Sequence, residues 1–494
     1  MRNIKIMRRN KIVGLGLALL SLGMTSCSDW FDVIPRSSVY EDDLYSKEQG
    51  FQSTLTGLYI AMGDNNLYGR ELTFGITDVV SGIYYLPKIN NNAYKYAAQY
   101  NYEYSSTKST ITGIWNSAYN VIANANVLLK EIGVKQDVDA ENTAGYTQSD
   151  KFNSAQTRDI IAGEALAVRA LLHLDLLRLY GANPQVDANK PSIPYVTALQ
   201  KEATPQSTTS EAIQKVITDL LQAEKLLKST DPIVEGNPAV DDTYFKKSCR
   251  ATHLNYYAVC GLLARAYQYA GDNENAGKWA KVVIDSKAFS WNTTTDWTKN
   301  NFIATKELLF NLYISDMKDR QTPYFKYSSE ENNEGQLLLM SAQRYNDLYD
   351  ATDKRGKGFM AYQGNYLCQK YVVTEGNVAD SLTVQHRIPV LRLSEMYYIL
   401  TESYLAEGKV EEAASTLDTE LKAYGLKNVD LTTSENIRKC LDQEYQREFV
   451  AEGQWFYYIK RRNASNLIDT QYVVDFVFPL PDNEYTYANR QKNK

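Results

Sequence analysis

Apolar residues recur at steps of three and four along most of the chain, and this spacing predicts amphipathic helices. In the segment 111–133 the spacing is followed by Ile114, Ala118, Ile122, Ala125 and Leu129. The longest such run ends at Gly181 and Pro184, two residues that stop helices. A further helix is predicted over 46–63, with Ser46 as its N-cap. The pattern therefore predicts a mostly helical protein.

Two later segments share one arrangement of residues. Leu263, Tyr267, Gly271, Ala276 and Ala280 have the same offsets as Leu400, Tyr404, Gly408, Ala413 and Leu417. Small residues where two antiparallel helices cross, with a glycine at the turn, are typical of tetratricopeptide repeats. A partial third copy lies at Leu174–Gly181. Because such pairs stack to bury their faces, we expect a mostly α fold: tetratricopeptide-like helix pairs forming an α-solenoid scaffold, with long aromatic loops and a little β structure.

The stretches between the helical runs are rich in aromatic residues. The tyrosines of "NNNAYKYAAQYNYEYSS" stand at even positions: Tyr94, Tyr96, Tyr100, Tyr102 and Tyr104. A period of two predicts an extended segment with its rings on one side. The segments 289–302, with Trp291 and Trp297, and 317–335 are predicted to be long loops, and long loops in a large domain commonly carry function.

The beginning of the chain has the composition of an export signal. Five basic residues precede a short apolar segment, Ile12–Gly23, and no acidic residue occurs before Asp29, as in a secretory signal peptide. The apolar segment is shorter than the roughly 20 residues of a membrane-spanning helix. It ends in "MTSC", which resembles a bacterial lipobox, so we expect residues 1–26 to be removed and Cys27 to carry lipid. The alternative is an ordinary signal peptide with an incidental cysteine.

The net charge limits the expected partners, and the cysteine spacing limits the expected metal and disulfide sites. Removal of residues 1–26 takes away five positive charges, so the formal net charge falls from −6 to −11. Such a surface repels nucleic acid, which is therefore not an expected partner. The chain has 38 Tyr against 14 Phe, a balance that suits surfaces both apolar and hydrogen-bonding. The remaining cysteines match no zinc or disulfide pattern and are predicted to be buried apolar residues: Cys249, Cys260, Cys368 and Cys440.

Several segments resemble, in order along the chain, motifs of the SusD/RagB family of outer-membrane lipoproteins from Bacteroidetes. "SDWFDVIP" after Cys27 is similar to the family's aromatic-acidic-proline start, and "EALAVRALLHLDLLRLYGANP" to its long helix closing on Leu-Tyr-Gly. "IWNSAYNVIANANVLL" resembles a helix motif through Trp115, Tyr119, Ile122, Ala125 and Asn126. Near the end, the matching residues are Arg392, Leu393, Glu395, Glu444, Glu448, Glu452, Gly453 and Trp455, followed by "FVFPLPDNE". Gln454 and Thr401 depart from the family pattern, where Arg and Ala are common.

The resemblance implies an organisation and a set of partners. It implies one SusD-like domain over 27–494, with an N-terminal family part at about 27–230 and a C-terminal part at about 300–494. It also implies an outer-membrane lipoprotein, anchored through Cys27 and facing the cell exterior. The implied partners are a SusC-like TonB-dependent transporter and a glycan or oligosaccharide ligand.

The residues give little support to an enzyme. His173, His253 and His386 form no HExxH motif, and the chain has no Gly-rich phosphate loop or GxSxG elbow. Glu444, Glu448 and Glu452 recur at steps of four and would share one helix face. They could form a metal or acid/base row, or a buried row paired with Arg392, Arg447, Lys460 or Arg461. We favour the buried row, because side chains on one helix cannot reach both faces of a glycosidic bond.

Two acidic segments, 137–142 and 271–277, have the alternating oxygen ligands that Ca²⁺ binds. Neither completes an EF-hand loop, and the second coincides with the turn of a predicted helix pair. We interpret both as solvated turns. No metal and no cofactor are predicted.

The aromatic loops are the best candidates for ligand binding. A concave aromatic site with a polar edge suits small-ligand capture, and sugar rings can lie against aromatic faces. The candidate residues are Tyr84, Tyr85, Tyr100, Tyr102, Tyr104, Trp291 and Trp297. These rings could instead pack on the helices or contact the transporter. A peptide-binding RagB-type member of the family is the alternative function, and an α-helical glycoside hydrolase is a more distant one.

Overall fold

The computed structural model describes residues 43–86, 92–134, 151–240, 245–372 and 386–494. The predicted signal peptide, Cys27 and the acidic segment 137–142 lie outside the described residues. The internal contacts of the chain divide it into Met1–Gly50 and Phe51–Lys494. The contacts described below are those within the second unit.

The N-terminal half is built on two long helices, α5 (Ser105–Ile132) and α6 (Ala155–Tyr180), which pack against each other. The backbone N–H of Thr157 donates to the Ser154 side chain at the start of α6, at 3.0 Å, as a capping residue does. Gly181 follows the last turn, as predicted from the stop signals. Helix α6 is buried around almost its whole circumference, so it forms the core of this half. The other helices of this half are α3 (Glu48–Met62), α4 (Ile76–Val80), α7 (Pro184–Asp187) and α8 (Thr209–Leu227).

The two predicted repeats form helix pairs. They are α9 (Tyr256–Ala270) with α10 (Asn273–Ser286), and α15 (Leu393–Ala406) with α16 (Val410–Tyr424). At their turns Gly271 and Gly408 have φ of 85° and 75°, which glycine adopts without strain. The first pair packs on the second through α10 and α15. A Cβ on Gly277 would lie 2.1 Å from Ser403 Oγ, so this contact requires glycine.

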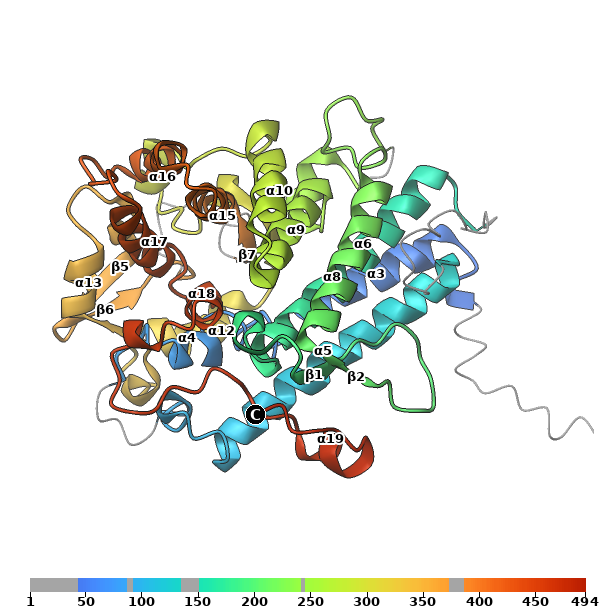
Figure 1. The fold of residues 1–494 in the computed structure, drawn as a ribbon, viewed down its shortest axis with the longest axis horizontal. Helices are drawn as coiled ribbons and strands as arrows, with labels where there is room; N and C mark the ends of the chain where they lie inside the picture. Colours follow the sequence, from blue (N-terminus) through green and yellow to red (C-terminus); the bar gives the residue numbers. More distant parts are fainter. Residues whose placement is uncertain (1–42, 87–91, 135–150, 241–244, 373–385) are drawn as a thin grey trace, which may run out of the picture. The chain divides into compact units, whose positions relative to one another are not determined.

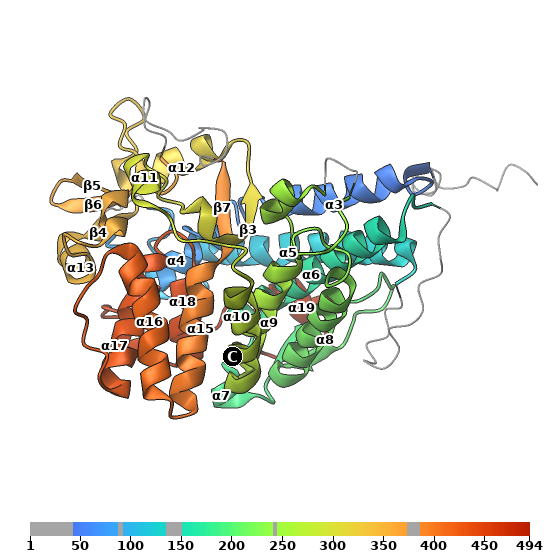
Figure 2. The same ribbon diagram turned by 90° about the horizontal axis from the view of Figure 1, so that it is seen from above.

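The helices continue as a row. Figure 2 shows α8, α9, α10, α15, α16 and α17 (Ser434–Glu448) side by side, with α18 (Gln454–Arg461) behind them. Figure 1 shows the same neighbours from a direction turned by 90°, with the row again running from α17 to α8 across the picture. The predicted mostly α fold with stacked tetratricopeptide-like pairs is confirmed. Among the described helices, none is both long and apolar enough to cross a membrane.

Within the described residues, three small antiparallel sheets accompany the helices. The first pairs β1 (Pro191–Pro194) with β2 (Gln206–Thr208), and the second pairs β3 (Leu308–Tyr313) with β7 (Arg387–Arg392). The third has the order β4 (Leu339–Ser341), β6 (Asn365–Cys368), β5 (Phe359–Tyr362). Short helices lie between them and at the end of the chain: α11 (Thr294–Thr298), α12 (Met317–Phe325), α13 (Ala342–Leu348) and α19 (Asp482–Tyr487).

Several local predictions are wrong, including the continuous loop at 289–302, which contains α11 at Thr294–Thr298. The described part of the tyrosine-rich segment is not extended but consists of turns and a 3₁₀ helix, Ala97–Gln99, because its backbone bonds are local ones such as Tyr100 N to Ala97 O at 2.9 Å. The segment 317–335 is not a continuous loop, since α12 occupies its first half. Of the four described cysteines, all free, Cys260, Cys368 and Cys440 are buried as predicted, whereas Cys249 is exposed.

Candidate ligand-binding surface

Three of the predicted ligand-binding rings are part of the core. Trp297 is only 3% exposed and packs with Ala304 and Tyr424. Tyr84 is buried, and its hydroxyl donates to Asp78 Oδ2 at 3.1 Å. Tyr102 is buried, and its hydroxyl donates to the carbonyl of Asp475 at 2.6 Å. These rings have the packing role that was the alternative interpretation.

Two further candidates are half-buried. The Tyr100 hydroxyl donates to the carbonyl of Val80 at 2.9 Å, and burial raises the pKa of Tyr100 to about 12. Trp291 packs on Tyr397 and Tyr424, with ring centroids 5.1 and 5.6 Å apart. Both rings are therefore tied to the body of the protein on at least one side.

Tyr85 and Tyr104 are the exposed members of the predicted set, at 47% and 40%. The Tyr104 ring is stacked on Tyr96, with centroids 3.5 Å apart and an interplanar angle of 19°. The backbone N–H of Tyr85 donates to Leu339 O at 2.7 Å, which makes an antiparallel bridge to β4. Successive side chains of an extended chain point to opposite faces, so Tyr84 enters the core while Tyr85 stays at the surface.

The bridge adds Tyr85 to the edge of the sheet β4–β6–β5. Leu339 lies opposite Leu367, and Leu367 lies opposite Met360, so a cross-strand row runs from Tyr85 to Met360. Residues directly opposite share a face of the sheet, and three inter-strand steps span about 14 Å. Tyr362, two residues beyond Met360, lies on this same face.

Tyr327 completes this group of rings. It is 42% exposed, and its ring centroid lies 5.3 Å from that of Tyr362. Leu337, Leu339 and Leu367 form a buried apolar cluster, and Tyr362 packs against it. We call Tyr85, Tyr327 and Tyr362 the tyrosine surface. Figure 2 shows β4, β5 and β6 together at one end of the row of helices.

Polar groups border the tyrosine surface. Strands β5 and β6 are joined by Gln363 and Gly364, both with positive φ, 46° and 75°, as in the two-residue turns typical of hairpins. The turn places Gln363 at the surface, where its Nε2 donates to the Tyr362 hydroxyl at 3.1 Å. Asn365 is partly exposed, and Glu334 is exposed. Rings with amide and carboxylate groups at their edge can hold a ligand that has both apolar faces and hydroxyl groups.

Sequence reasoning did not select Tyr327 or Tyr362. Tyr327 belongs to an irregular stretch that was noted for its composition, and Tyr362 precedes the Gln-Gly dipeptide of the hairpin. A Gly-containing two-residue turn between aromatic residues is a hairpin signal and could have indicated β5 and β6. Nothing in the sequence indicates that these strands pair with β4 next to Tyr85.

The three glutamates of the C-terminal segment are buried and paired. Arg355 Nη1 lies 2.8 Å from Glu444 and 3.1 Å from Glu448. Arg392 Nη1 lies 3.0 Å from Glu448, and its Nε lies 2.8 Å from Glu452. Burial by itself raises the pKa of Glu444, but the nearby Arg355 and Arg447 lower it to about 2.

The favoured interpretation of a buried row is therefore supported, with two differences. The helix α17 ends at Glu448, so Glu452 lies beyond it and does not share its face. Arg392 and Arg447 are partners as expected, but Lys460 and Arg461 are not. Lys460 donates to the carbonyl of Leu179, and Arg461 pairs with Glu402. Arg355, which was not predicted, takes a central place.

The network around these glutamates has more carboxyl groups than cationic side chains. It joins six carboxyl groups to four cationic side chains: Glu307, Asp353, Glu420, Glu444, Glu448 and Glu452 with Arg355, Lys370, Arg392 and Arg447. Burial, reinforced by Glu448, raises the pKa of Glu307 to about 7. Burial also raises the pKa of Glu420, with the nearby Glu444 adding to the effect. Both shifts favour the protonated, neutral form of these carboxyls, which reduces the excess of negative charge in the buried network.

The motif residues of the N-terminal half are also structural. Arg169 makes a two-pronged pair with Asp219, at 2.7 and 2.8 Å, and donates to Asn126 at 3.0 Å. His173 stacks on Tyr195 with centroids 3.9 Å apart. Burial lowers the pKa of His173 to about 3, so the ring is neutral. Of the segment 271–277, interpreted as a solvated turn, only Gly271 and Asp272 form the turn; Asp272 caps α10, whose first residues make up the rest of the segment.

Two family models match consecutive parts of the chain. The model described as "starch-binding associating with outer membrane" matches residues 29–268, and the model of the SusD family matches residues 264–493. Together they extend over nearly the whole sequence. The chain belongs to the SusD family.

Two curated relatives agree with this membership. "SusD-like protein P2" of Formosa agariphila is 24% identical over 284 residues, which are 57% of this chain, and "SusD-like protein P25" of the same organism is 24% identical over 168 residues, 32% of this chain. The matches extend over only 47% and 28% of these relatives' lengths.

The solved structures share the fold. A SusD superfamily protein from Bacteroides thetaiotaomicron has a TM-score of 0.71 at 20% identity, over 91% of this chain and 100% of that chain. A SusD-like carbohydrate binding protein from Bacteroides vulgatus has a TM-score of 0.66 at 19% identity, over 84% of each chain. At these identities the likeness concerns the fold alone.

Proposed function

We propose that this SusD-family protein is a cell-surface lipoprotein that binds a glycan or oligosaccharide and passes it to a SusC-like TonB-dependent transporter. Membership of the family supports the general role, and the tyrosine surface is the observation that supports the ligand class. Its rings offer apolar faces to sugar C–H groups, while Glu334, Gln363 and Asn365 offer polar partners to hydroxyls. Each contact of this kind is weak by itself, so several rings together would hold a ligand reversibly.

We further propose that the protein binds its ligand without cleaving it. The carboxylates with the most suggestive spacing, Glu444, Glu448 and Glu452, are held by guanidinium groups in the interior. A hydrolase needs two carboxyl groups that flank a bound glycosidic bond. These buried ion pairs do not offer that arrangement.

Isothermal titration calorimetry with a panel of oligosaccharides and a panel of peptides tests the ligand class. We expect heat of binding with at least one oligosaccharide, and a loss of affinity of tenfold or more in the double variant Tyr327→Ala/Tyr362→Ala. Tyr487→Ala is the matched control, since Tyr487 is 83% exposed on α19 and lies outside the tyrosine surface. Binding of peptides alone would favour the RagB-type alternative and contradict the proposal.

The anchor is tested separately. We propose that residues 1–26 are cleaved and that Cys27 is acylated, because a cysteine after small residues at the end of the apolar segment fits lipid attachment. Several acyl chains hold a protein to a membrane firmly. The variant Cys27→Ala should be recovered in the soluble fraction, whereas Cys249→Ala, which changes an exposed cysteine of the described residues, should remain with the outer membrane. Retention of Cys27→Ala in the membrane would contradict lipid anchoring.

A further inference from the structure

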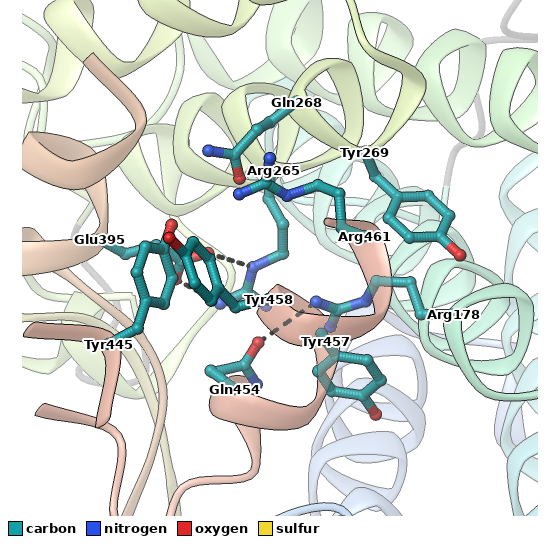
Figure 3. A pocket seen from close by; sticks show the side chains of 10 residues that line it. All are labelled: Arg178, Arg265, Gln268, Tyr269, Glu395, Tyr445, Gln454, Tyr457, Tyr458 and Arg461. Atoms are coloured by element: carbon teal, nitrogen blue, oxygen red, sulfur yellow. Dashed lines mark hydrogen bonds and ion pairs between the residues drawn. The ribbon is translucent and has the colours of Figure 1, made fainter. Parts of the chain in front are cut away.

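The pocket between the helices and the tyrosine surface differ in what can reach them. Figure 3 shows the pocket, in which Arg265 donates to Glu395 and Arg178 donates to Gln454. All ten side chains that line it are buried, at 8% exposure or less. The pocket therefore offers no surface against which a sugar ring can lie. Tyr327, in contrast, is 42% exposed, and an exposed ring is held in place only if the loop that carries it is held.

Tyr327 lies in the loop 326–338, which joins α12 to β4. The backbone N–H of Leu338 donates to the carbonyl of Tyr324 at 2.9 Å and closes the base of this loop. Inside the loop, Asn333 is only 3% exposed, although the residues on either side of it are exposed. Burying an amide side chain is costly unless its donors and its acceptor find partners, so the partners of Asn333 show what it does.

The Asn333 side chain binds the two peptide groups that flank Tyr327. Its Nδ2 donates to the carbonyl of Lys326 at 2.7 Å and to the carbonyl of Pro323 at 3.2 Å. Its Oδ1 accepts the backbone N–H of Ser328 at 2.9 Å. The Lys326 carbonyl belongs to the peptide group before Tyr327, and the Ser328 N–H belongs to the one after it. Because peptide groups are planar, holding both restricts the φ and ψ of Tyr327 and the direction of its side chain.

This direction places the Tyr327 ring next to Tyr362. The two ring centroids lie 5.3 Å apart, with an interplanar angle of 39°. Pairing of β5 with β6 fixes the backbone of Tyr362, whereas Tyr327 belongs to no helix or strand. Asn333 therefore provides for Tyr327 the support that the sheet provides for Tyr362. A ring that is already held in its binding position loses less conformational freedom when a ligand binds, so the ligand binds more tightly.

We propose that Asn333 is a positioning residue of the tyrosine surface, which holds the Tyr327 ring beside Tyr362 before a ligand binds. This inference rests on the proposed function, and the buried Asn333 acts through Tyr327 rather than by touching the sugar. Asparagine suits the role because one short side chain carries two N–H donors and an acceptor oxygen. Aspartate would lose both donated hydrogen bonds, and alanine would lose all three.

A double-mutant cycle tests this role by calorimetry on the chain without residues 1–26. The probes are maltoheptaose, mannohexaose and xylohexaose, and the one that binds the unaltered chain most tightly is used throughout. Asn333→Ala should weaken its binding by about two- to tenfold. In the Tyr327→Ala background the same change should weaken binding by less than about twofold, because a positioning residue has no effect once the residue that it positions is removed. Equal effects in both backgrounds, or no effect in either, would overturn the proposal.

Asn183 gives the matched control. It is also buried, its Nδ2 donates to the carbonyls of Lys460 and Arg461, and its Oδ1 accepts the backbone N–H of Gln185. It caps α7, which packs with α8 and α9. Asn183→Ala should lower the melting temperature and leave the affinity unchanged. A loss of affinity equal to that of Asn333→Ala would mean that Asn333 acts through general stability, and would overturn the proposal.

Amide hydrogen exchange, followed by mass spectrometry, tests the contact without any ligand. Asn333→Ala should speed exchange of the Ser328 amide by at least about tenfold and leave that of the Leu338 amide, at the base of the loop, within about twofold. Unchanged exchange at Ser328, or an equal increase at Leu338, would overturn the role of Asn333. These outcomes do not bear on the proposed function, which is contradicted instead if no oligosaccharide binds the unaltered chain.

Discussion

The tyrosine surface and the cluster formed by Trp291, Trp297 and Tyr424 differ in what covers their rings. Both consist of aromatic residues from irregular or short segments, and both have polar groups nearby. In the tryptophan cluster, Tyr424 of α16 packs on the two indole rings, with centroids 5.6 and 6.1 Å away. No comparable helix is described over Tyr85 and Tyr327, which stay 42–47% exposed. Aromatic composition alone therefore does not distinguish a binding surface from a core. The difference depends on whether another helix packs over the rings.

The polar groups differ in the same way. The Tyr424 hydroxyl donates to Glu307 Oε2 at 2.6 Å, inside the buried network of carboxylates and guanidiniums. The Tyr362 hydroxyl instead accepts from Gln363 at an exposed hairpin turn. A hydroxyl used within a buried network fixes the fold, whereas one at an exposed edge can exchange its partner for a ligand.

The largest expected effect is a difference in stability between variants of the tryptophan cluster and variants of the tyrosine surface. The change Trp297→Ala removes a buried indole and should lower the free energy of unfolding by about 3–5 kcal/mol. The change Tyr327→Ala should lower it by no more than about 0.5 kcal/mol, as for most exposed positions. Urea denaturation of both variants measures this difference. If Trp297→Ala were as stable as the unaltered chain, the assignment of the tryptophan cluster to the core would be wrong.

The second expected effect is a pH dependence of stability. It concerns Glu307, which accepts a hydrogen bond from Tyr424 of the tryptophan cluster. Burial raises the pKa of Glu307 to about 7 from its ordinary value of 4.5, so the folded state binds this proton more tightly than the unfolded state. The resulting stabilisation is complete below pH about 4.5 and is lost as the pH rises through 7. A shift of this size corresponds to about 3 kcal/mol.

The variant Glu307→Gln keeps a neutral side chain at every pH and should remove this loss. We expect its free energy of unfolding, relative to that of the unaltered chain, to increase between pH 5 and pH 8 in urea titrations. The exposed Glu330→Gln is the control and should show no such trend. A constant difference between Glu307→Gln and the unaltered chain across this range would show that Glu307 is not protonated in the folded state.

Tyr84 and Tyr85 are neighbours in the sequence, but Tyr84 is buried and Tyr85 is exposed. Variants of the two therefore compare a core ring with a surface ring. Tyr85→Ala should weaken oligosaccharide binding by about 0.5–1.5 kcal/mol, or roughly two- to tenfold, with little change in the melting temperature. Tyr84→Phe keeps the buried ring and loses only the hydrogen bond to Asp78, so it should lower stability by about 1 kcal/mol and leave affinity unchanged. Calorimetry measures the oligosaccharide affinity of each variant, and thermal denaturation measures the melting temperature of each. An affinity loss in Tyr84→Phe that exceeds the loss in Tyr85→Ala would reverse the assignment.

The smallest effect concerns Tyr104. Its ring is exposed but already stacked on Tyr96, so Tyr104→Ala should reduce stability by about 0.5 kcal/mol and oligosaccharide affinity by less than twofold. Titration of this variant beside Tyr85→Ala shows whether exposure alone, or exposure within the tyrosine surface, selects binding residues. A tenfold loss for Tyr104→Ala would extend the surface to the 3₁₀ segment.

The sequence predicted the helices well because their signals are local. The steps of three and four, the stop at Gly181 and the repeat glycines each act within a few residues. The prediction of an extended tyrosine-rich segment was wrong, because an alternating pattern is only a tendency. Local backbone hydrogen bonds such as Tyr100 N to Ala97 O form turns there instead. The candidate site could be predicted only in part, with Tyr85 on the surface and Trp297 in the core.

By itself, the sequence determined the helical scaffold, its repeated pairs and its family, because periodicity and ordered motifs survive in a single chain. Tertiary structure decided which aromatic residues are available to a ligand. Tyr85 becomes part of a surface only through its bridge to Leu339, more than 250 positions along the chain. Trp297 is buried because Ala304 and the distant Tyr424 pack with it. Burial depends on contacts between segments that are distant in the sequence, so a local sequence pattern cannot predict which of these rings are buried.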